Sequence, residues 1–421
     1  MDPDGDSDGG FEDAAAEDMA EVVDLNEADG EYVIDDMGDM DSEGFDGDGD
    51  EEGDDENEDE AEGMDAPAED ELEDDADFVY DKHTASVFCC DLEPTKGALA
   101  VTGSEDDKAY VWKIGDGQPV LECSGHKDSV ACVGFSHDGS LVVSGDMSGL
   151  IKVWKVDTQE EIWSFECSDL EWLTWHHSSH VLFGGTSEGQ IWMWKVPSGD
   201  CKTLQGHGCQ TTCGKIFADG KRCCAGYEDG TVKIWDLKET TALHTFKGNT
   251  GHSSGVTSLD CHSNNIVVLT GSVDGTAKVL NSNNAKVLAT FSAGNVKPEI
   301  GDSNSVEAVG LCQSQSLAAV GSLNGILGVW DIPTQKRRHC CQLEAGIVRL
   351  RWDPSGTPTI FTAGLDGRVC LWDARSGESV ASWTGHRGEI LDMAISNDGN
   401  TIVTASGDTS CRVFSLQRPE R

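Results

Sequence analysis

Short runs of apolar and β-branched residues, separated by Gly, Asp and Ser, fill the chain from residue 78 onward. The clearest stretch, 365–399, holds an Asp-Gly turn at Asp366, a run ending at Trp372, a Gly-His pair at His386 and an apolar run over 390–395. Short runs of this kind between turn residues are typical of antiparallel strands. The pattern predicts an all-β protein.

The residue that ends the third strand of this unit recurs eight times. Successive copies lie 42, 40, 41, 45, 50, 42 and 42 residues apart. A period of about 40–45 residues with Gly-His and Trp-Asp pairs is typical of WD repeats, each of which forms a four-stranded blade. The sequence therefore predicts an eight-bladed WD40 β-propeller over 78–421, with third strands that end at Trp112, Trp154, Trp194, Trp235, Leu280, Trp330, Trp372 and Phe414.

Four histidines keep the same register, each 28 residues before the end of a third strand. In a strong blade this His, a Ser or Thr, an Asp in the following turn and the Trp form a buried hydrogen-bonded chain. Blade four is expected to hold His207, Asp229 and Trp235, whereas blade two offers Ser148 at the turn. We assign to this structural framework, and not to catalysis, His126, Trp154, His207, Asp229, Trp235, His252, Asp274, Trp372, His386 and Asp408.

The two ends of the repeat region complement each other. Too few residues follow Phe414 to form the outer strand of blade eight, and the run 78–80 stands where an outer strand should precede blade one. The first strand is therefore predicted to complete the last blade, which removes the open edges that a broken ring would expose.

Charge divides the chain at about residue 77. Residues 1–77 hold 38 Asp or Glu and no Lys or Arg, whereas the remainder holds 40 acidic and 29 basic residues. A segment with this charge and few aromatics cannot bury enough apolar surface to fold. The sequence predicts a disordered acidic leader over 1–77 and one propeller domain over 78–421.

Motifs for catalysis are absent from the sequence, and we expect neither an enzyme nor a cofactor. There is no phosphate loop, nucleophile elbow or H-E-x-x-H zinc motif. The run His207-x-Cys209-x3-Cys213 resembles a metal site, but its His belongs to the framework, so no metal site is predicted. Negative charge in both parts of the chain disfavours direct nucleic-acid binding.

Cysteine usage and hydropathy indicate the compartment. The 16 cysteines form no C-x-x-C pair, no apolar run reaches the ~18 residues of a membrane span, and the chain opens without a secretion signal. We expect a cytoplasmic monomer with reduced thiols, with a nuclear location or peripheral membrane association as alternatives.

The predicted propeller has an acidic rim. Loops that precede the first strand of a blade, and those between its second and third strands, share one face and are rich in Asp and Glu here. Such a rim suits a Lys/Arg-rich segment of a partner protein. The alternative is that turns favour Asp and that Trp172 packs inside its blade. The candidate contact set is Asp169, Glu171, Trp172, Glu188, Glu228 and Glu389.

The tetrapeptide Trp372-Asp373-Ala374-Arg375 supports a different hypothesis. A W-D-x-R box is similar to the one by which some WD propellers join cullin ubiquitin ligases as substrate receptors. A signalling scaffold at the cell cortex is a further alternative.

Several segments are more specific than the residues common to all WD repeats. They are GSEDDKAYVW (103–112), GHKDSVACVGFSHDGSLV (125–142), GDMSGLIKVW (145–154), DLEW (169–172), IWMWKVPSGDCKT (191–203), GYEDGTVKIWDLK (226–238) and SNSVEAVG (303–310). Together with the acidic leader they resemble the angio-associated migratory cell protein family of WD-repeat proteins. The resemblance implies a cytoplasmic, partly membrane-associated scaffold linked to cell migration and angiogenesis. It also implies kinship with a fungal escort of a basic ribosomal protein.

Overall fold

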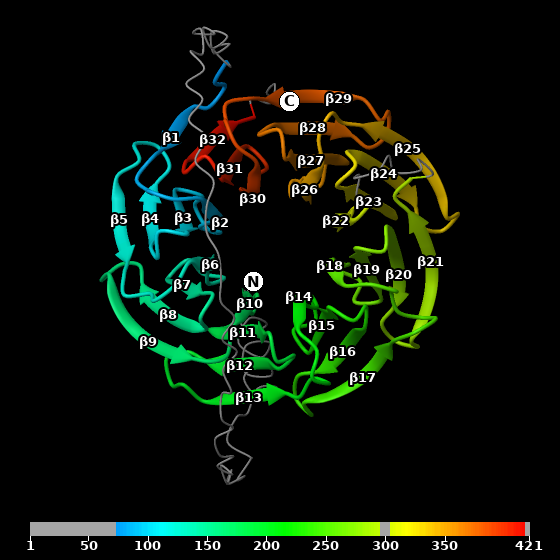
Figure 1. The fold of residues 1–421 in the computed structure, drawn as a ribbon, viewed down its shortest axis with the longest axis horizontal. Coiled ribbons are helices and arrows are strands. Elements are labelled where there is room, and N and C mark those ends of the chain that lie inside the picture. The colour runs from blue at the N-terminus through cyan, green and yellow to red at the C-terminus, as the bar shows by residue number, and fades with distance from the viewer. Residues whose placement is uncertain (1–72, 295–303, 417–421) are drawn as a thin grey trace, which may run out of the picture.

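The computed structural model describes residues 73–294 and 304–416. They form eight four-stranded antiparallel sheets, the blades, arranged as a closed ring (Figure 1). Every regular element in these ranges is a strand, so the predicted eight-bladed, all-β propeller is confirmed. No helix in the described residues is long and apolar enough to cross a membrane. The disordered leader is predicted over 1–77, and its residues 1–72 lie outside the described residues.

In each blade the first strand lies nearest the centre of the ring and the fourth lies at the periphery (Figure 1). The inner strands are β2 (Val87–Leu92), β6 (Val130–Phe135), β10 (Leu170–Trp175), β14 (Thr211–Ile216), β18 (Val256–Cys261), β22 (Val306–Leu311), β26 (Ile347–Trp352) and β30 (Ile390–Ile395). The second strands are β3 (Leu99–Ser104), β7 (Leu141–Asp146), β11 (Val181–Thr186), β15 (Arg222–Tyr227), β19 (Val267–Ser272), β23 (Leu317–Ser322), β27 (Thr359–Gly364) and β31 (Thr401–Ser406).

The third strands end where the repeat predicts. They are β4 (Ala109–Lys113), β8 (Leu150–Lys155), β12 (Ile191–Lys195), β16 (Val232–Asp236), β20 (Thr276–Asn281), β24 (Ile326–Asp331), β28 (Val369–Asp373) and β32 (Cys411–Ser415). The outer strands are β5 (Pro119–Cys123), β9 (Glu160–Glu166), β13 (Cys201–Leu204), β17 (Thr241–Phe246), β21 (Lys286–Ser292), β25 (Lys336–Gln342), β29 (Ser379–Trp383) and β1 (Phe78–Tyr80).

A β-bulge occurs near the start of every inner strand, where one extra residue enters the pairing with the second strand. In blade three the register passes from Leu170 opposite Thr186 to Trp172 opposite Gly185, so Glu171 is the extra residue. A bulge bends the strand and re-aims the side chains on either side of it. The side chains at the entrance of each inner strand therefore do not follow simple alternation.

The ring closes through the first strand of the domain. β1 pairs antiparallel with β32, placing Phe78 opposite Val413 and Tyr80 opposite Cys411. Figure 1 shows these two strands, from opposite ends of the colour bar, side by side. The predicted closure is confirmed. It gives blade eight its outer strand, so β32, like the third strand of every other blade, pairs with a strand on each side.

The side chain of Tyr80 binds the closing strand to blade one. Its ring stacks on Trp112 with centroids 4.5 Å apart and planes 6° from parallel, and the residue is 1% exposed. Its hydroxyl has no hydrogen-bond partner among the described residues. Two residues that precede β1 also contact blade eight. Asp74 forms an ion pair with Arg412 at 3.2 Å, and Asp75 accepts a hydrogen bond from the amide of Thr384 at 2.8 Å. Contacts with blade eight therefore begin before β1 itself.

We expect Tyr80→Ala to lower the free energy of unfolding by about 3–5 kcal/mol, the range for removing a large buried aromatic ring. Urea titration followed by tryptophan fluorescence measures this change. Tyr80→Phe keeps the stacked ring and should cost little, because the lost hydroxyl is unpartnered. Val79→Ala, at the 36% exposed neighbouring position, is the control on the same strand. Equal losses in Tyr80→Ala and Val79→Ala would contradict a closure held by ring stacking.

Candidate protein-binding site

The loop before the inner strand and the loop between the second and third strands lie together at one end of every blade. In each blade a backbone N–H just after the second strand donates to a carbonyl just before the inner strand, over 2.9–3.1 Å. We call these paired loops the rim. It comprises residues 81–86, 105–108, 124–129, 147–149, 167–169, 187–190, 205–210, 228–231, 247–255, 273–275, 304–305, 323–325, 343–346, 365–368, 384–389 and 407–410.

Four of the predicted carboxylates are exposed on this rim: those of Asp169, Glu188, Glu228 and Glu389. The fifth, that of Glu171, is half-buried at the bulge just below it. Within the described residues none of the five forms an ion pair, whereas other rim carboxylates do, such as those paired in Arg368–Glu344 and Lys247–Asp229. The predicted set therefore places unpaired negative charge on blades three, four and eight.

Trp172 is not part of the exposed surface. It is 8% exposed and belongs to an apolar cluster between blades three and four. A Cβ on Gly185 would lie 2.1 Å from its indole nitrogen, and one on Gly214 would lie 2.2 Å from its ring. The ring therefore fills the space that these two glycines leave. The hypothesis that Trp172 contacts a partner directly is wrong, and its packing alternative is correct.

The sequence pattern did not predict three exposed apolar side chains on the rim. Met147, Val273 and Leu365 are 49%, 50% and 44% exposed, and each is the first residue after the second strand of its blade. Glu228 occupies the same position in blade four. The register of the repeat alone could have found them, since this position directly follows the end of the second strand in every blade. The rim thus holds exposed apolar side chains on blades two, five and seven, beside the carboxylates of blades three, four and eight.

Blade one contains a complete framework network. The Nδ1 of His83 lies 3.1 Å from the carboxylate of Asp106, and its Nε2 lies 3.0 Å from the hydroxyl of Thr102. The indole N–H of Trp112 donates to the same hydroxyl at 3.3 Å. Because the carboxylate can only accept, Nδ1 carries the proton and the hydroxyl donates to Nε2. Every polar group in this buried chain has a partner.

In blade two the acidic partner differs from the prediction. His126 bonds Asp146 at 3.0 Å and Ser144 at 2.8 Å, and Trp154 donates to Ser144 at 3.3 Å. Asp146 is the last residue of β7 and lies two positions before the turn residue Ser148. Ser148 occupies the turn position, as predicted, but the carboxylate that pairs with His126 comes from the end of the strand. The hydroxyl of Ser148 donates to Asp146 at 2.7 Å.

Blades five and eight keep the His and Asp but replace the Trp. His252 lies 3.2 Å from Asp274, and His386 lies 2.9 Å from Asp408. Both rings also reach a threonine hydroxyl of the second strand, at 2.9 and 2.7 Å respectively. Leu280 and Phe414 occupy the Trp positions of these blades as buried apolar side chains, with no polar group that needs a partner.

Blade four does not form the expected buried network. His207 lies 3.1 Å from Asp229, but the pair is on the surface and the side chain of His207 is 23% exposed. The second strand offers Ala225 where blades one, two, five and eight have Thr or Ser. The indole nitrogen of Trp235 consequently has no partner among the described residues. Although burial opposes it, hydrogen bonds from Thr231 and then His207 lower the pKa of Asp229 to about 2.

The chain is similar in sequence to known WD-repeat proteins. The family described as "WD domain, G-beta repeat" matches residues 77–113, 117–155, 199–236, 241–281, 336–373 and 377–415, together more than half of the chain. Angio-associated migratory cell protein from Homo sapiens is 51% identical over 358 residues, which cover 83% of this chain and 82% of the relative.

The chain belongs to the angio-associated migratory cell protein family of WD-repeat proteins. WD-repeat propellers are typically interaction scaffolds without catalytic activity. Each matched repeat runs from the outer strand of one blade to the third strand of the next. The one-strand offset explains why the first strand of this family member belongs to its last blade.

More distant relatives share the fold. The ribosome assembly protein SQT1 of Saccharomyces cerevisiae is 25% identical over 382 residues, covering 80% of this chain and 86% of the relative. A crystal structure of Chaetomium thermophilum Sqt1 bound to the N-terminus of the ribosomal protein L10 superposes with a TM-score of 0.74. That superposition has 22% sequence identity and covers 82% of this chain and 100% of the other.

Carboxylates also join neighbouring blades of this family member around the centre of the ring. Three aspartates on inner strands each accept a hydrogen bond from a backbone amide of the next blade, which satisfies an amide on the free edge of that strand. The pairs are Asp91 with Phe135 at 2.8 Å, Asp260 with Leu311 at 2.7 Å, and Asp392 with Cys90 at 3.1 Å. Burial raises the pKa of Asp91 to about 6, although the amide of Phe135 opposes the shift.

We expect His252→Ala to lower the free energy of unfolding by about 2–4 kcal/mol, because it removes a buried imidazole together with its hydrogen bonds to Asp274 and Thr270. His207→Ala, at the equivalent position of blade four, should cost less than about 1 kcal/mol because its ion pair is on the surface. Urea titration of both variants measures the difference. Equal costs would show that blade four contains a network as strong as that of blade five.

Asp91→Asn should remove a pH-dependent loss of folding stability. The pKa of Asp91 in the fold lies above its ordinary value of about 3.9, so the folded state holds this proton more tightly than the unfolded chain does. Ionised Asp91 therefore lowers stability above about pH 6, and this cost vanishes below about pH 4. Asn keeps an oxygen acceptor for the amide of Phe135. The stability of the variant relative to the parent should be greatest at pH 7, by at most about 3 kcal/mol for two pKa units.

Urea titrations at pH 7, 6, 5 and 4 test this prediction. Asp157→Asn, at an exposed position, is the matched control for the removal of a carboxylate. A difference for Asp91→Asn that stays constant or grows as the pH falls would contradict the proposed cost of ionising Asp91.

Proposed function

We propose that the rim binds a basic segment of a partner protein. The observation that carries this proposal is the combination, on one face, of exposed unpaired carboxylates with exposed apolar side chains. The carboxylates are those of Asp169, Glu188, Glu228 and Glu389, and none has a Lys or Arg partner within the described residues. An extended Lys/Arg-rich segment supplies those partners, and the aliphatic stems of its side chains cover the apolar residues between them.

Charge favours the same class of partner at longer range. The complete chain has a formal net charge of −49, of which the first 77 residues contribute −38. Like-signed charge on the leader and the rim attracts a basic protein and accelerates its encounter with the rim. The same charge repels nucleic acid, so the partner we propose is a protein and not its nucleic-acid complex.

Relatives support a client from the ribosome. The yeast relative is named a ribosome assembly protein, and the Chaetomium Sqt1 structure contains the N-terminus of ribosomal protein L10. Ribosomal proteins are basic, and the positive charge of a free ribosomal protein must be shielded until the protein binds ribosomal RNA. We infer that this chain escorts a basic ribosomal protein during ribosome assembly, as a monomer. The name of the human relative supports a further role in cell migration and angiogenesis.

One alternative, a substrate receptor of a cullin ubiquitin ligase, requires Arg375 to contact another protein. In the fold this guanidinium donates to both carboxylate oxygens of Asp373, at 3.1 and 2.8 Å. The side chain of Arg375 is also 66% exposed, so part of the group faces solvent. A second alternative is a signalling scaffold at the cell cortex. The rim carboxylates favour the escort over both, because neither alternative accounts for them.

The free thiols support a reducing compartment. All 16 cysteines lie in the described ranges, and none forms a disulfide. Proteins of the cytosol and nucleus keep their thiols reduced. We propose a cytoplasmic location, with nuclear residence or peripheral association with the cell membrane as the alternatives.

The double substitution Glu188→Lys with Glu228→Lys should weaken binding of a basic peptide at least tenfold, because it replaces attraction by repulsion on neighbouring blades. The probe is a synthetic peptide with the N-terminal sequence of ribosomal protein L10, and fluorescence anisotropy measures its Kd. The affinity of the parent protein should also fall several-fold between about 50 and 300 mM NaCl as salt screens the charges.

Glu378→Lys is the matched control for charge reversal. Glu378 is exposed in the loop between the third and outer strands of blade seven, on the face opposite to the rim. A peptide in which Gln replaces every Lys and Arg controls for the positive charge. Undiminished binding to the rim variant, or an equal loss in Glu378→Lys, would contradict a binding site on the rim.

A further inference from the structure

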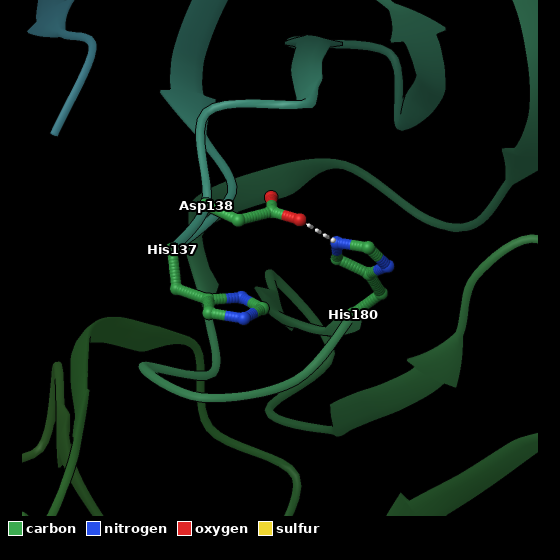
Figure 2. A group of neighbouring side chains, drawn as sticks. All are labelled: His137, Asp138 and His180. Atoms are coloured by element: carbon green, nitrogen blue, oxygen red, sulfur yellow. Dashed lines mark hydrogen bonds and ion pairs between the residues drawn. The ribbon is translucent and has the colours of Figure 1, made fainter. Parts of the chain in front are cut away.

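A second cluster of chemically active side chains lies on the face opposite to the rim, where the turns between inner and second strands gather. His137 and Asp138 belong to the turn between β6 and β7 of blade two, and His180 ends the corresponding turn of blade three. Figure 2 shows the carboxylate of Asp138 facing the imidazole of His180, with the ring of His137 directed toward the same space. The two loops are about 40 residues apart in sequence, at the repeat period.

The distances between these groups are short. His180 Nε2 lies 3.1 Å from Asp138 Oδ2, and the rings of His137 and His180 have centroids 5.3 Å apart. One nitrogen of each histidine and one carboxylate oxygen all lie within 4.8 Å of one another. The three potential ligand atoms therefore surround a volume the size of a single ion.

Neighbouring groups orient the carboxylate. The Oδ1 atom of Asp138 accepts three hydrogen bonds: from the hydroxyl of Ser136 at 2.7 Å, the hydroxyl of Ser140 at 2.8 Å and the amide of Ser140 at 3.1 Å. These bonds direct Oδ2 toward His180. Outer partners that fix a carboxylate in this way are a regular feature of metal sites. The ring of His180 in turn packs edge-on against Trp175, with centroids 6.4 Å apart.

We propose that His137, Asp138 and His180 bind a Zn²⁺ ion. Zinc takes imidazole nitrogen and carboxylate oxygen at about 2.0–2.2 Å, which places neighbouring ligand atoms of a tetrahedral site about 3.3 Å apart. The 3.1 Å between His180 and Asp138 matches this spacing. His137 is exposed on its turn and closes the remaining gap by rotation of its side chain. Three protein ligands leave the fourth position to water or to a ligand from another molecule.

The zinc ion joins two blades. In its absence the pair His180–Asp138 and the ring contact between His137 and His180 connect these turns. Metal coordination replaces the contacts of His180 Nε2 with Asp138 and the Ser140 hydroxyl by three bonds to a common ion. Zinc therefore stabilises the fold in proportion to its occupancy, and it adds positive charge to the face opposite the acidic rim. A cavity of about 240 Å³, lined in part by His137, His176 and His177, adjoins the site.

A second group of potential ligands, His207, Cys209 and Asp229, also comes within 4.8 Å, but it suits a cation less well. The ammonium of Lys247 lies 3.4 Å from the carboxylate of Asp229 and already neutralises it. Cys213, which the sequence pattern placed with His207 and Cys209, lies on β14 and is not in the group. This second group provides the matched control for the first.

The test uses Co²⁺ as a spectroscopic substitute for zinc, added to the full-length protein after treatment with a chelator. One equivalent should bind with visible d–d bands and no thiolate-to-cobalt charge-transfer band, because the proposed ligands are nitrogen and oxygen. Zn²⁺ should displace it stoichiometrically and raise the melting temperature. His180→Ala and Asp138→Asn should each weaken binding at least tenfold, whereas His207→Ala should leave it unchanged.

Melting temperatures of the metal-free variants show whether each variant is folded. His180 and Asp138 lie on surface turns, so these temperatures should stay within a few degrees of that of the parent protein. Binding that persists in both His180→Ala and Asp138→Asn would overturn the proposal. A thiolate charge-transfer band that disappears in His207→Ala would overturn it too, since it would place the metal on the rim.

Discussion

The pairing of β1 with β32 is the contact on which the ring depends. It brings together strands more than 300 residues apart in sequence, and it supplies the outer strand that blade eight lacks. Each of the other blades is a local meander whose strands pair with sequence neighbours. A local meander forms at small entropic cost, whereas this one long-range pairing converts an open row of blades into a closed ring. The stacked rings of Tyr80 and Trp112 extend that contact to the next blade.

Inside a blade, the second strand decides whether the histidine is buried. Where it offers a hydroxyl, as at Thr102 or Thr270, the imidazole donates to the Asp at one end and accepts from the hydroxyl at the other, so its burial is compensated. Where Ala225 takes that place, His207 stays at the surface and Trp235 lacks a partner. The spacing of histidines predicted their positions but not their burial, because burial depends on a residue that the Gly-His and Trp-Asp pattern does not include.

The repeat period was sufficient to predict the fold, the blade number and the closing strand, because each is a property of strand order. Side-chain orientation at the rim was not predictable in the same way. The bulge at Glu171 breaks the alternation that would assign Trp172 to one face, and the space for its ring comes from Gly214 in the next blade. In blade two, Asp146 reaches His126 from the end of a strand because the carboxylate, and not its position in sequence, is what the imidazole requires.

The two faces of the ring differ in how their carboxylates are balanced. On the opposite face Asp138 accepts hydrogen bonds from serines and lies against His180, and near the centre Asp91, Asp260 and Asp392 accept backbone amides. Those carboxylates contribute to the fold. The rim carboxylates of Glu188 and Glu228 have no such partner, so folding alone gives no reason for their placement. Like charges on one face without compensation lower stability, and a surface that keeps them is suited to a cationic partner that removes the repulsion when it binds.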